Sequence, residues 1–394
     1  MKVEGKRLAI VTCCQDDWGG SEELWSRSLT YLNKSDIQDI TLFKNKVNLN
    51  HPEFKKLQHE NITFQELDPN LKGLGRVLSK SRFLARRFGA RLGLMEYYWD
   101  KTALRLYKLL KTKRPHLVVI SQGINFDGLV YAYQCLKLNI PYIIVAHKAV
   151  SFYWPNHEER HYMKRTLLEA KQCFFVSKHN QNLTEEQFGM RLKNGSIILN
   201  PVKTQVKPLP YPHTVDGLKL ACVGRLFVID KGQDILLRIL AQDKWRERNI
   251  SVTFFGSGPD KEGLKEMAAL LNVNSVIFSE FTSDIHEIWS THHALILPSR
   301  SEGLPLTVIE AMSLGRVVIA TNAGGTNEIV ENGVTGFIGD ASEKDFDEAM
   351  EAAWRNRNDW ESMGRSAASH IDSTIPQHPE TEFAHFIMNT LNER

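Results

Sequence analysis

The sequence lacks a long apolar run, and its 394 residues contain only five cysteines. No stretch approaches the roughly 18 consecutive apolar residues that a membrane-spanning helix requires. The apolar run at 8–14 is short and has no small-residue cleavage site after it, and Asp16 and Asp17 come next. We therefore interpret it as a first buried strand and not as a signal peptide. The cysteines show neither a disulfide nor a metal-binding spacing, so we expect buried thiols and a cytoplasmic protein.

A strong net charge is also absent, but the charge is unevenly distributed. The formal net charge is +3, yet residues 1–200 hold 31 Lys and Arg against 19 Asp and Glu, and residues 201–394 hold 18 against 27. A chain of this length is too long for one ordinary core and predicts about two domains. The opposite charges predict that the two domains have different partners, with the basic half facing something acidic.

Short apolar runs alternate with longer amphipathic segments along the chain, which is the pattern of βαβ units with a parallel sheet. Residues 201–217 are rich in Pro and polar residues and are typical of a linker. We expect Rossmann-like α/β domains over 1–205 and 206–372, and a C-terminal helix over 373–394, for which crossing back to the first domain is one option. The expected strands are 8–12, 40–43, 117–121, 142–146, 174–177 and 197–199, then 218–223, 252–255, 276–278, 294–297, 317–320 and 336–338.

Two glycines, Gly19 and Gly20, follow the first expected strand. In open α/β sheets, ligands bind outside the carboxyl ends of the strands. Glycines there allow close backbone approach, Ser21 is a good N-cap, and a helix N-terminus attracts anions. The alternative is an ordinary turn between a strand and a helix.

Two cations follow the first expected strand of the second half. Arg225 comes directly after Gly224, and Lys231 lies six positions further on, before Gly232. Two such cations could clamp the phosphates of one diphosphate, and the alternative is two solvated surface charges. The glycines at 256 and 258 resemble half of a dinucleotide-binding fingerprint, and we interpret them as a tight turn before a helix.

The segment 298–312 combines two carboxylates with an expected helix N-terminus. Pro305 suits the first turn of that helix, and backbone N–H groups near it would point at an anion. Glu302 precedes the helix, and Glu310 lies about one and a half turns inside it. One carboxylate could reach a sugar and the other a ribose, while the alternative is two unrelated surface glutamates. The expected ligand-binding residues here are Gly303, Leu304, Pro305, Leu306 and Thr307.

Taken together, these motifs resemble the retaining GT-B glycosyltransferases of family 4. The resemblance rests on Gly19-Gly20, Gly224-Arg225, Lys231-Gly232, Glu302, Glu310, Ala323-Gly324-Gly325, Glu328-Ile329-Val330 and residues 332–337. In the first half, Val145-Ala146-His147, Val176-Ser177 and Leu199-Asn200-Pro201 follow the family's order. The family usually has Asn-Gly where this chain has Asn200-Pro201, which puts the backbone of that loop in doubt.

The resemblance implies a role for each matched residue of the second half, and a fold of two Rossmann-like domains facing a cleft. Arg225 and Lys231 would bind the donor diphosphate and act in catalysis. Glu310 would bind the ribose, and Glu302 would contact hydroxyl groups of the transferred sugar. Gly224 and residues 303–307 would complete the donor site.

In the first half, the resemblance places Gly19 and Gly20 close to the phosphates of the donor. His147, just past an apolar strand, would point into the cleft near the reacting sugar. Without the family, a single histidine after a strand is more often structural.

The implied reaction transfers a hexose-type sugar from a nucleotide-diphosphate sugar to a hydroxyl group of a saccharide or lipid-linked acceptor, as in polysaccharide biosynthesis. A UDP-sugar is the favoured donor, and GDP-mannose is the second option. No DxD-like metal motif lies in a suitable loop, so we expect no metal and no cofactor, and we expect no nucleic-acid partner. The alternatives are a sugar-nucleotide 2-epimerase and a non-catalytic nucleotide-sugar-binding protein. A Rossmann oxidoreductase is disfavoured, because no complete GxGxxG motif follows the first strand.

A basic segment runs from Lys72 to Leu92 and contains seven basic residues and no acidic one. As a helix it would carry apolar residues on one side and basic residues on the other. Such a helix could lie on an anionic membrane surface, which would make the protein peripheral on the inner face of the membrane. The alternative is a solvated helix packed on the first domain.

Overall fold

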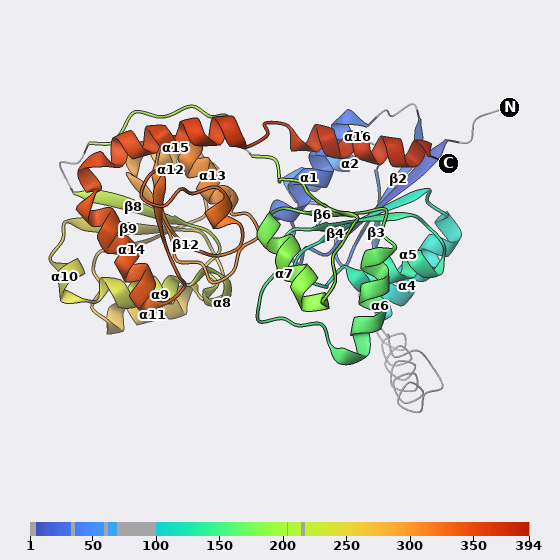
Figure 1. Cartoon of the computed structure of the whole chain (residues 1–394), viewed down its shortest axis with the longest axis horizontal. Helices are drawn as coiled ribbons and strands as arrows, with labels where there is room; N and C mark the ends of the chain where they lie inside the picture. Colours follow the sequence, from blue (N-terminus) through green and yellow to red (C-terminus); the bar gives the residue numbers. More distant parts are fainter. Residues whose placement is uncertain are drawn as a thin grey trace. The chain divides into compact units, whose positions relative to one another are not determined.

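The computed structural model describes residues 5–32, 36–58, 62–68, 100–202, 204–213 and 217–393. The chain divides into two compact units (Figure 1). The first unit comprises Met1–Pro201 and His378–Arg394, and the second comprises Val202–Gln377. The basic segment from Lys72 to Leu92 lies outside the described residues, so its membrane role stays a prediction. None of the helices within the described ranges has the length and apolar character that a bilayer crossing requires.

The first unit contains a seven-stranded parallel sheet with strand order β3-β2-β1-β4-β5-β6-β7. Strands covered on both faces read as continuous apolar runs, and all residues of β4 and β5 are buried. The strands are β1 (Lys6–Thr12), β2 (Ile37–Lys44), β3 (Ile62–Glu66), β4 (Leu117–Gln122), β5 (Tyr142–Ala146), β6 (Gln172–Phe175) and β7 (Gly195–Ile197).

Helices cover both faces of this sheet. Successive residues of a strand contact different helices, because their side chains point to opposite faces. Ala9 and Val11 pack with α4, α5 and α6, whereas Leu8 and Ile10 pack with α1, α2 and α16 (Figure 1). The helices are α1 (Gly20–Ser28), η1 (Leu29–Tyr31), α2 (Pro52–Gln58), α4 (Lys101–Lys113), α5 (Leu129–Lys137), α6 (His157–Leu168), α7 (Lys178–Phe188) and α16 (Pro379–Asn392).

Helix α16 is separated from the rest of the first unit by the whole second unit in sequence. Its residues Phe383, Ile387 and Leu391 are buried in the same core cluster as Leu24 and Trp25 of α1. The ring of Phe383 also packs edge-on against Phe174 of β6, with centroids 5.5 Å apart. The core of the first unit is therefore built from two separate stretches of chain.

The second unit contains a six-stranded parallel sheet with strand order β10-β9-β8-β11-β12-β13. Helices α9, α11 and α14 lie on one face and α12, α13 and α15 on the other (Figure 1). The strands are β8 (Leu218–Val223), β9 (Ile250–Phe255), β10 (Val276–Ser279), β11 (Ala294–Leu297), β12 (Val317–Thr321) and β13 (Gly336–Gly339). The helices are α8 (Val228–Lys231), α9 (Gln233–Leu240), α10 (Asp243–Arg246), α11 (Lys261–Leu270), α12 (Ile285–Thr291), α13 (Leu306–Ser313), η2 (Thr326–Glu328), α14 (Glu343–Arg355), η3 (Arg357–Asp359) and α15 (Trp360–Thr374).

The segment after residue 201 is held to the second unit by a buried arginine. Arg316 is only 1% exposed, and burial lowers its pKa to about 10. Its guanidinium group donates hydrogen bonds to backbone carbonyls, which satisfies a charge that would otherwise be costly to bury. The acceptors are Leu209, Pro210, Trp289, His292, Leu314 and Gly315.

Candidate active site

The strand order of the second sheet changes direction between β8 and β11, because β9 continues from β8 on one side and β12 from β11 on the other. Loops that leave two such strands run to opposite faces and leave a crevice at the carboxyl edge, where open α/β sheets bind ligands. Gly224 and Arg225 directly follow β8, and residues 298–305 follow β11. The sequence-predicted residues of this unit therefore lie on the two loops at the switch point or on helices α8 and α13, which follow them.

The loop after β8 is held against the loop after β9 by glycines. Gly256 has a φ of +150°, and a Cβ atom on it would lie 2.1 Å from the carbonyl oxygen of Gly224. A Cβ atom on Gly258 would lie 2.2 Å from the carbonyl oxygen of Leu226. The N–H group of Leu226 also donates a hydrogen bond to the carbonyl oxygen of Ser257 at 2.9 Å. These glycines therefore permit the close approach of two loops. They position the loop that carries Arg225.

Lys231 ends the short helix α8, and its side chain reaches the loop after β11. Its Nζ atom lies 2.6 Å from Oε1 of Glu302, and Ser299 Oγ donates to the same oxygen at 2.6 Å. Gly232 makes this approach possible, since its φ is +61° and a Cβ atom would lie 2.1 Å from the carbonyl oxygen of Pro298. An ammonium group has three N–H donors, so Lys231 can keep Glu302 and still bind an anion.

Arg225 is the more exposed of the two cations. Its side chain is 44% exposed, and its Nη2 atom lies 3.2 Å from Oδ2 of Asp230. The guanidinium group also lies over the ring of Phe227, 4.9 Å from the ring centroid. Each cation of the candidate site thus has a nearby carboxylate.

Helix α13 presents its N-terminus at the same edge of the sheet. The helix begins at Leu306, so Pro305 is its N-cap residue and not part of its first turn as expected. The first N–H groups of a helix have no partner within it. No hydrogen bond from the N–H of Leu306 or Thr307 is found to any residue that the structure describes. These donors and the helix dipole favour an anion there.

The loop before α13 rests on the glycines of residues 323–325. Gly324 has a φ of +59°, and a Cβ atom would lie 2.4 Å from the carbonyl oxygen of Glu302 and 2.5 Å from that of Gly303. Gly325 N–H also donates to Gly303 O at 2.8 Å. The glycine pair therefore supports the backbone that carries Glu302.

Both predicted carboxylates belong to this loop and helix. Glu302 and Glu310 are each 7% exposed, and Glu310 lies on α13. Buried carboxylates need hydrogen-bond donors, and Lys231 and Ser299 supply them to Glu302. The arrangement therefore combines two cations, a helix N-terminus and two buried carboxylates at one switch point.

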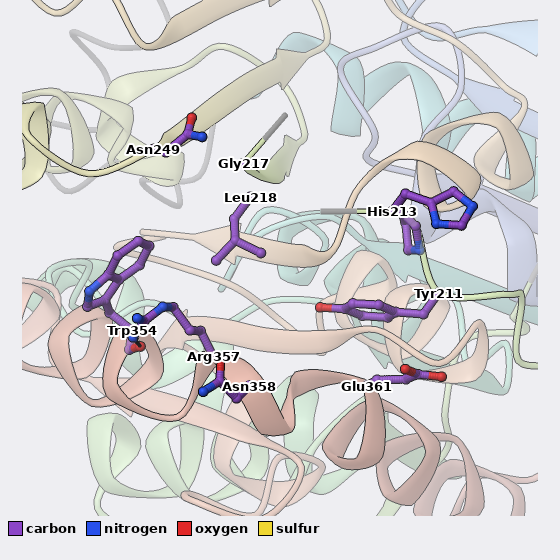
Figure 2. Close-up of a pocket in the computed structure, with 10 residues that line it drawn as sticks. Tyr211, His213, Gly217, Leu218, Asn249, Trp354, Arg357, Asn358 and Glu361 are labelled. Carbon is purple, nitrogen blue, oxygen red and sulfur yellow. Dashed lines mark hydrogen bonds between the residues drawn. The ribbon is translucent and has the colours of Figure 1, made fainter. Parts of the chain in front are cut away.

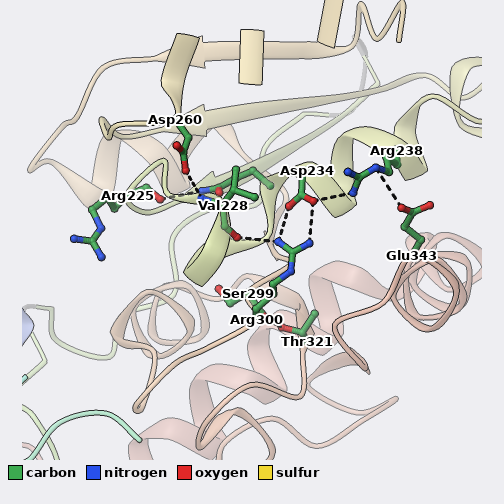
Figure 3. A network of polar contacts seen from close by, with 10 residues as sticks. Arg225, Val228, Asp234, Arg238, Asp260, Ser299, Arg300, Thr321 and Glu343 are labelled. Atoms are coloured by element: carbon green, nitrogen blue, oxygen red, sulfur yellow. Dashed lines mark hydrogen bonds and ion pairs between the residues drawn. The ribbon is translucent and has the colours of Figure 1, made fainter. Parts of the chain in front are cut away.

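A polar network outside the predicted set joins the loop after β11 to helix α9 (Figure 3). Arg300 donates to Oδ1 and Oδ2 of Asp234 at 2.6 and 2.8 Å. Asp234 also accepts from Arg238 at 2.7 Å, and Arg238 lies 3.3 Å from Glu343. Burial opposes the ionisation of Asp234, but the bonds from the two arginines lower its pKa below the usual value. Sequence reasoning missed this pair, although Arg300 lies within the segment 298–312.

In the first unit, Gly19 is the N-cap residue of α1 and Gly20 is the first residue of that helix. They follow β1, and the strand order of this sheet changes direction between β1 and β4. Lys44 holds the connecting loop, since its Nζ atom donates to Cys14 O at 2.6 Å and lies 3.3 Å from Oε1 of Glu22. The predicted phosphate-proximal glycines are thus at a switch point as well.

His147 lies directly after β5 and is buried. Its Nε2 atom lies 3.2 Å from Ser121 Oγ, which donates to Ser21 O at 3.0 Å. His147 is therefore linked through Ser121 to the first turn of α1. Burial lowers the pKa of His147 to about 4, so the ring is neutral at physiological pH.

A pocket of about 610 Å³ opens at the opposite edge of the second sheet (Figure 2). Leu218 begins β8 and Asn249 precedes β9, so the amino ends of these strands line the pocket. Its other walls include Tyr211, Trp354 and Arg357. The pocket is thus separate from the strand ends that carry the predicted site residues.

In the part of the chain that the structure describes, no three His, Cys, Asp or Glu side chains gather in a way that could hold a metal ion. The expectation of a reaction without metal stays a prediction.

Residues 211–370 match the family of glycosyl transferases group 1. The matched residues all lie within the second unit. The assignment to family 4 and the retaining mechanism stay predictions.

Two relatives share part of the sequence. An uncharacterized glycosyltransferase from Haemophilus influenzae is 30% identical over 225 residues, which cover 54% of this chain and 60% of that protein. The GDP-mannose-dependent alpha-(1-6)-phosphatidylinositol monomannoside mannosyltransferase of Mycolicibacterium smegmatis is 34% identical over 138 residues, 32% of this chain and 35% of that protein. The chain thus covers less than two thirds of the length of either relative.

Among solved structures, the Anabaena protein HepE in complex with UDP is similar in fold. It superposes with a TM-score of 0.71 at 16% identity and covers 98% of this chain and 100% of its own. With the two parallel sheets, this likeness confirms the prediction of a GT-B fold built from two Rossmann-like units.

Proposed function

We propose that the protein is a retaining glycosyltransferase that moves a hexose from a UDP-sugar to a hydroxyl group of a saccharide or lipid-linked acceptor without a metal ion. The observation that carries the proposal is the gathering of Arg225, Lys231, Glu302, Glu310 and the α13 N-terminus at the β8–β11 switch point. The HepE complex contains UDP, which favours a UDP-sugar over GDP-mannose as the donor. The name of the Mycolicibacterium smegmatis relative keeps GDP-mannose as the second option.

The chemistry follows from the charges at this edge. The bond between the anomeric carbon and the donor phosphate breaks, so negative charge grows on the leaving nucleoside diphosphate. Lys231, Arg225 and the N–H groups of α13 are fixed before the reaction, and preorganised donors stabilise such a charge most effectively. The acceptor oxygen bonds to the anomeric carbon on the side that the phosphate leaves, and its proton passes to a phosphate oxygen.

The two carboxylates have different roles in this proposal. Glu310 accepts hydrogen bonds from the ribose hydroxyls, a contact made equally before and during the reaction. Glu302 accepts hydrogen bonds from hydroxyl groups of the transferred sugar, while its pairing with Lys231 keeps its position fixed.

Calorimetry with UDP, GDP, ADP and TDP tests the donor assignment on the intact protein. We expect UDP to bind most tightly and Lys231→Ala to weaken that binding. Transfer of labelled glucose from UDP-glucose to an added saccharide then tests the reaction. Interconversion of free sugar nucleotides without transfer would instead support an epimerase, and the absence of binding by all four nucleotides would refute the proposal.

A further inference from the structure

The loop after β11 is held to α8 by three hydrogen bonds and to the following helix α9 by two. The N–H groups of Arg300 and Ser301 both donate to Asp230 O, at 2.8 and 3.1 Å. The guanidinium group of Arg300 donates to Val228 O at 2.8 Å and to both carboxylate oxygens of Asp234. The bonds of the Arg300 side chain to Val228 and Asp234 are drawn in Figure 3.

Two of the residues that these bonds join are direct neighbours in the chain of the site residues Lys231 and Glu302. Lys231 directly follows Asp230 in the chain, and Glu302 directly follows Ser301. The bonds from the N–H groups of Arg300 and Ser301 to Asp230 O therefore hold together the backbone next to Lys231 and Glu302, whose Nζ and Oε1 atoms lie 2.6 Å apart. Val228 begins α8, so Arg300 also fixes the start of the short helix that ends at Lys231.

The geometry of the Arg300–Asp234 pair suits a positioning role better than a ligand-binding role. A bidentate arginine–carboxylate pair fixes both distance and orientation. The Asp234 side chain is only 10% exposed, and the pair already uses both of its oxygens. A four-residue helix such as α8 has little stability of its own and depends on such contacts.

We propose that Arg300 and Asp234 are positioning residues that hold Lys231 in register with Glu302 and the α13 N-terminus, and thereby set the affinity for the diphosphate of the donor. This inference rests on the proposed function of the site. Loss of the Arg300 side chain removes its bond to Val228 O at the start of α8 as well as its pair with Asp234, so α8 should shift. A misplacement of about 1 Å can lower a reaction rate about a hundredfold.

The chain offers a matched control, because Asp234 has a second arginine partner. Arg238 donates to Asp234 at 2.7 Å from the next turn of α9 and makes no described contact with the loop after β11. Arg238→Met removes one guanidinium group from the same carboxylate and leaves all five bonds that hold the loop after β11 to α8 and α9. We expect its kcat and its affinity for UDP to stay within about twofold of the parent protein, as for a half-exposed pair.

The test compares Arg300→Met, Arg300→Lys and Arg238→Met for binding of UDP and UMP by calorimetry. Arg300→Met should weaken UDP about tenfold, the scale of one charge-assisted hydrogen bond, and leave UMP within about twofold. Its kcat should fall by about a hundredfold. Arg300→Lys keeps the charge but not the bidentate geometry, so it should lie between the parent and Arg300→Met.

A double-variant cycle shows whether Arg300 acts through Lys231. In a Lys231→Ala background, Arg300→Met should cause little further loss of UDP affinity, because the group that it positions is already absent. Additive losses would overturn the inference, and so would equal weakening of UDP and UMP. Arg300→Lys serves as the folded variant if Arg300→Met does not fold, and parent-like UDP binding and turnover in it would also overturn the inference. Failure of the parent protein to bind UDP would instead refute the UDP-sugar assignment of the proposed function.

Discussion

The ammonium group of Lys231 has two expected contributions: its ion pair with Glu302 stabilises the fold, and its positive charge stabilises the leaving nucleoside diphosphate. Replacing Lys231 by Met removes both, and they can be measured separately. Lys231 Nζ lies 2.6 Å from Glu302 Oε1, and the two side chains are 21% and 9% exposed. Met keeps an unbranched apolar chain and removes the charge. Glu302 would retain the hydroxyl of Ser299 as a donor but lose its cation.

The expected magnitudes follow from this burial. Removing one partner of a buried ion pair costs about 3–5 kcal/mol, because the other charge stays without compensation. Lys231 is about one-fifth exposed, so water screens part of this cost and we expect about 2–3 kcal/mol. For a unit of this size that corresponds to a Tm lower by roughly 5–10 °C. Turnover should fall by about 10²–10³-fold.

Scanning calorimetry and initial rates of sugar transfer measure the two effects separately. The double variant Lys231→Met with Glu302→Gln should regain most of the lost Tm, since no uncompensated carboxylate remains, but not the lost turnover. If the double variant is as unstable as Lys231→Met alone, the ion pair is not the source of the stability loss. Near-normal turnover in Lys231→Met would refute the role of this lysine at the leaving group.

Four further predictions address the other groups of the site. Arg225→Ala should lower turnover by about a hundredfold in steady-state assays with little change in Tm, because Arg225 is half-exposed. Glu310→Ala should weaken the binding of free UDP in calorimetry more than it lowers kcat, since ribose contacts form equally in the ground and transition states. NMR of the product should show the anomeric configuration of the donor, and the rate should be unchanged by EDTA; a β-linked product would contradict retention. Because burial lowers the pKa of His147 to about 4 from the usual 6.5, unfolding takes up a proton between these values. Stability should thus fall by up to about 3 kcal/mol as the pH drops from 6.5 to 4, and denaturant titrations of His147→Asn should show a smaller fall.

The strands covered on both faces could be predicted, because a strand buried on both faces has apolar residues at successive positions of the sequence. Strands β4 and β11 are wholly buried and read as apolar runs. Strand β3 was not predicted, since it pairs only with β2 at the edge of the sheet and its sequence mixes Thr, Gln and Glu with two apolar residues. An edge strand with a partly exposed face carries no comparable run.

The residues of the candidate site that directly follow a strand could be predicted, because ligands bind at the carboxyl ends of the strands in such sheets. Arg225 and Glu302 could be found because they follow β8 and β11 within a few residues. The pairing of Arg300 with Asp234 could not be found, because the two residues are 66 positions apart and only the fold brings them together. The glycines at 256 and 258 were interpreted as a tight turn, whereas the structure shows that they admit the carbonyls of Gly224 and Leu226.

The return of α16 to the first unit has a consequence for synthesis on the ribosome. The apolar groove that receives Phe383, Ile387 and Leu391 is made early, but the helix that fills it follows all of residues 202–377. At about 5–20 residues per second, roughly 10–35 s pass between the two events. The second unit can complete its fold during this interval, while the nascent first unit still exposes an apolar surface. That surface is a point at which a chaperone can bind the growing chain and at which truncated chains would aggregate.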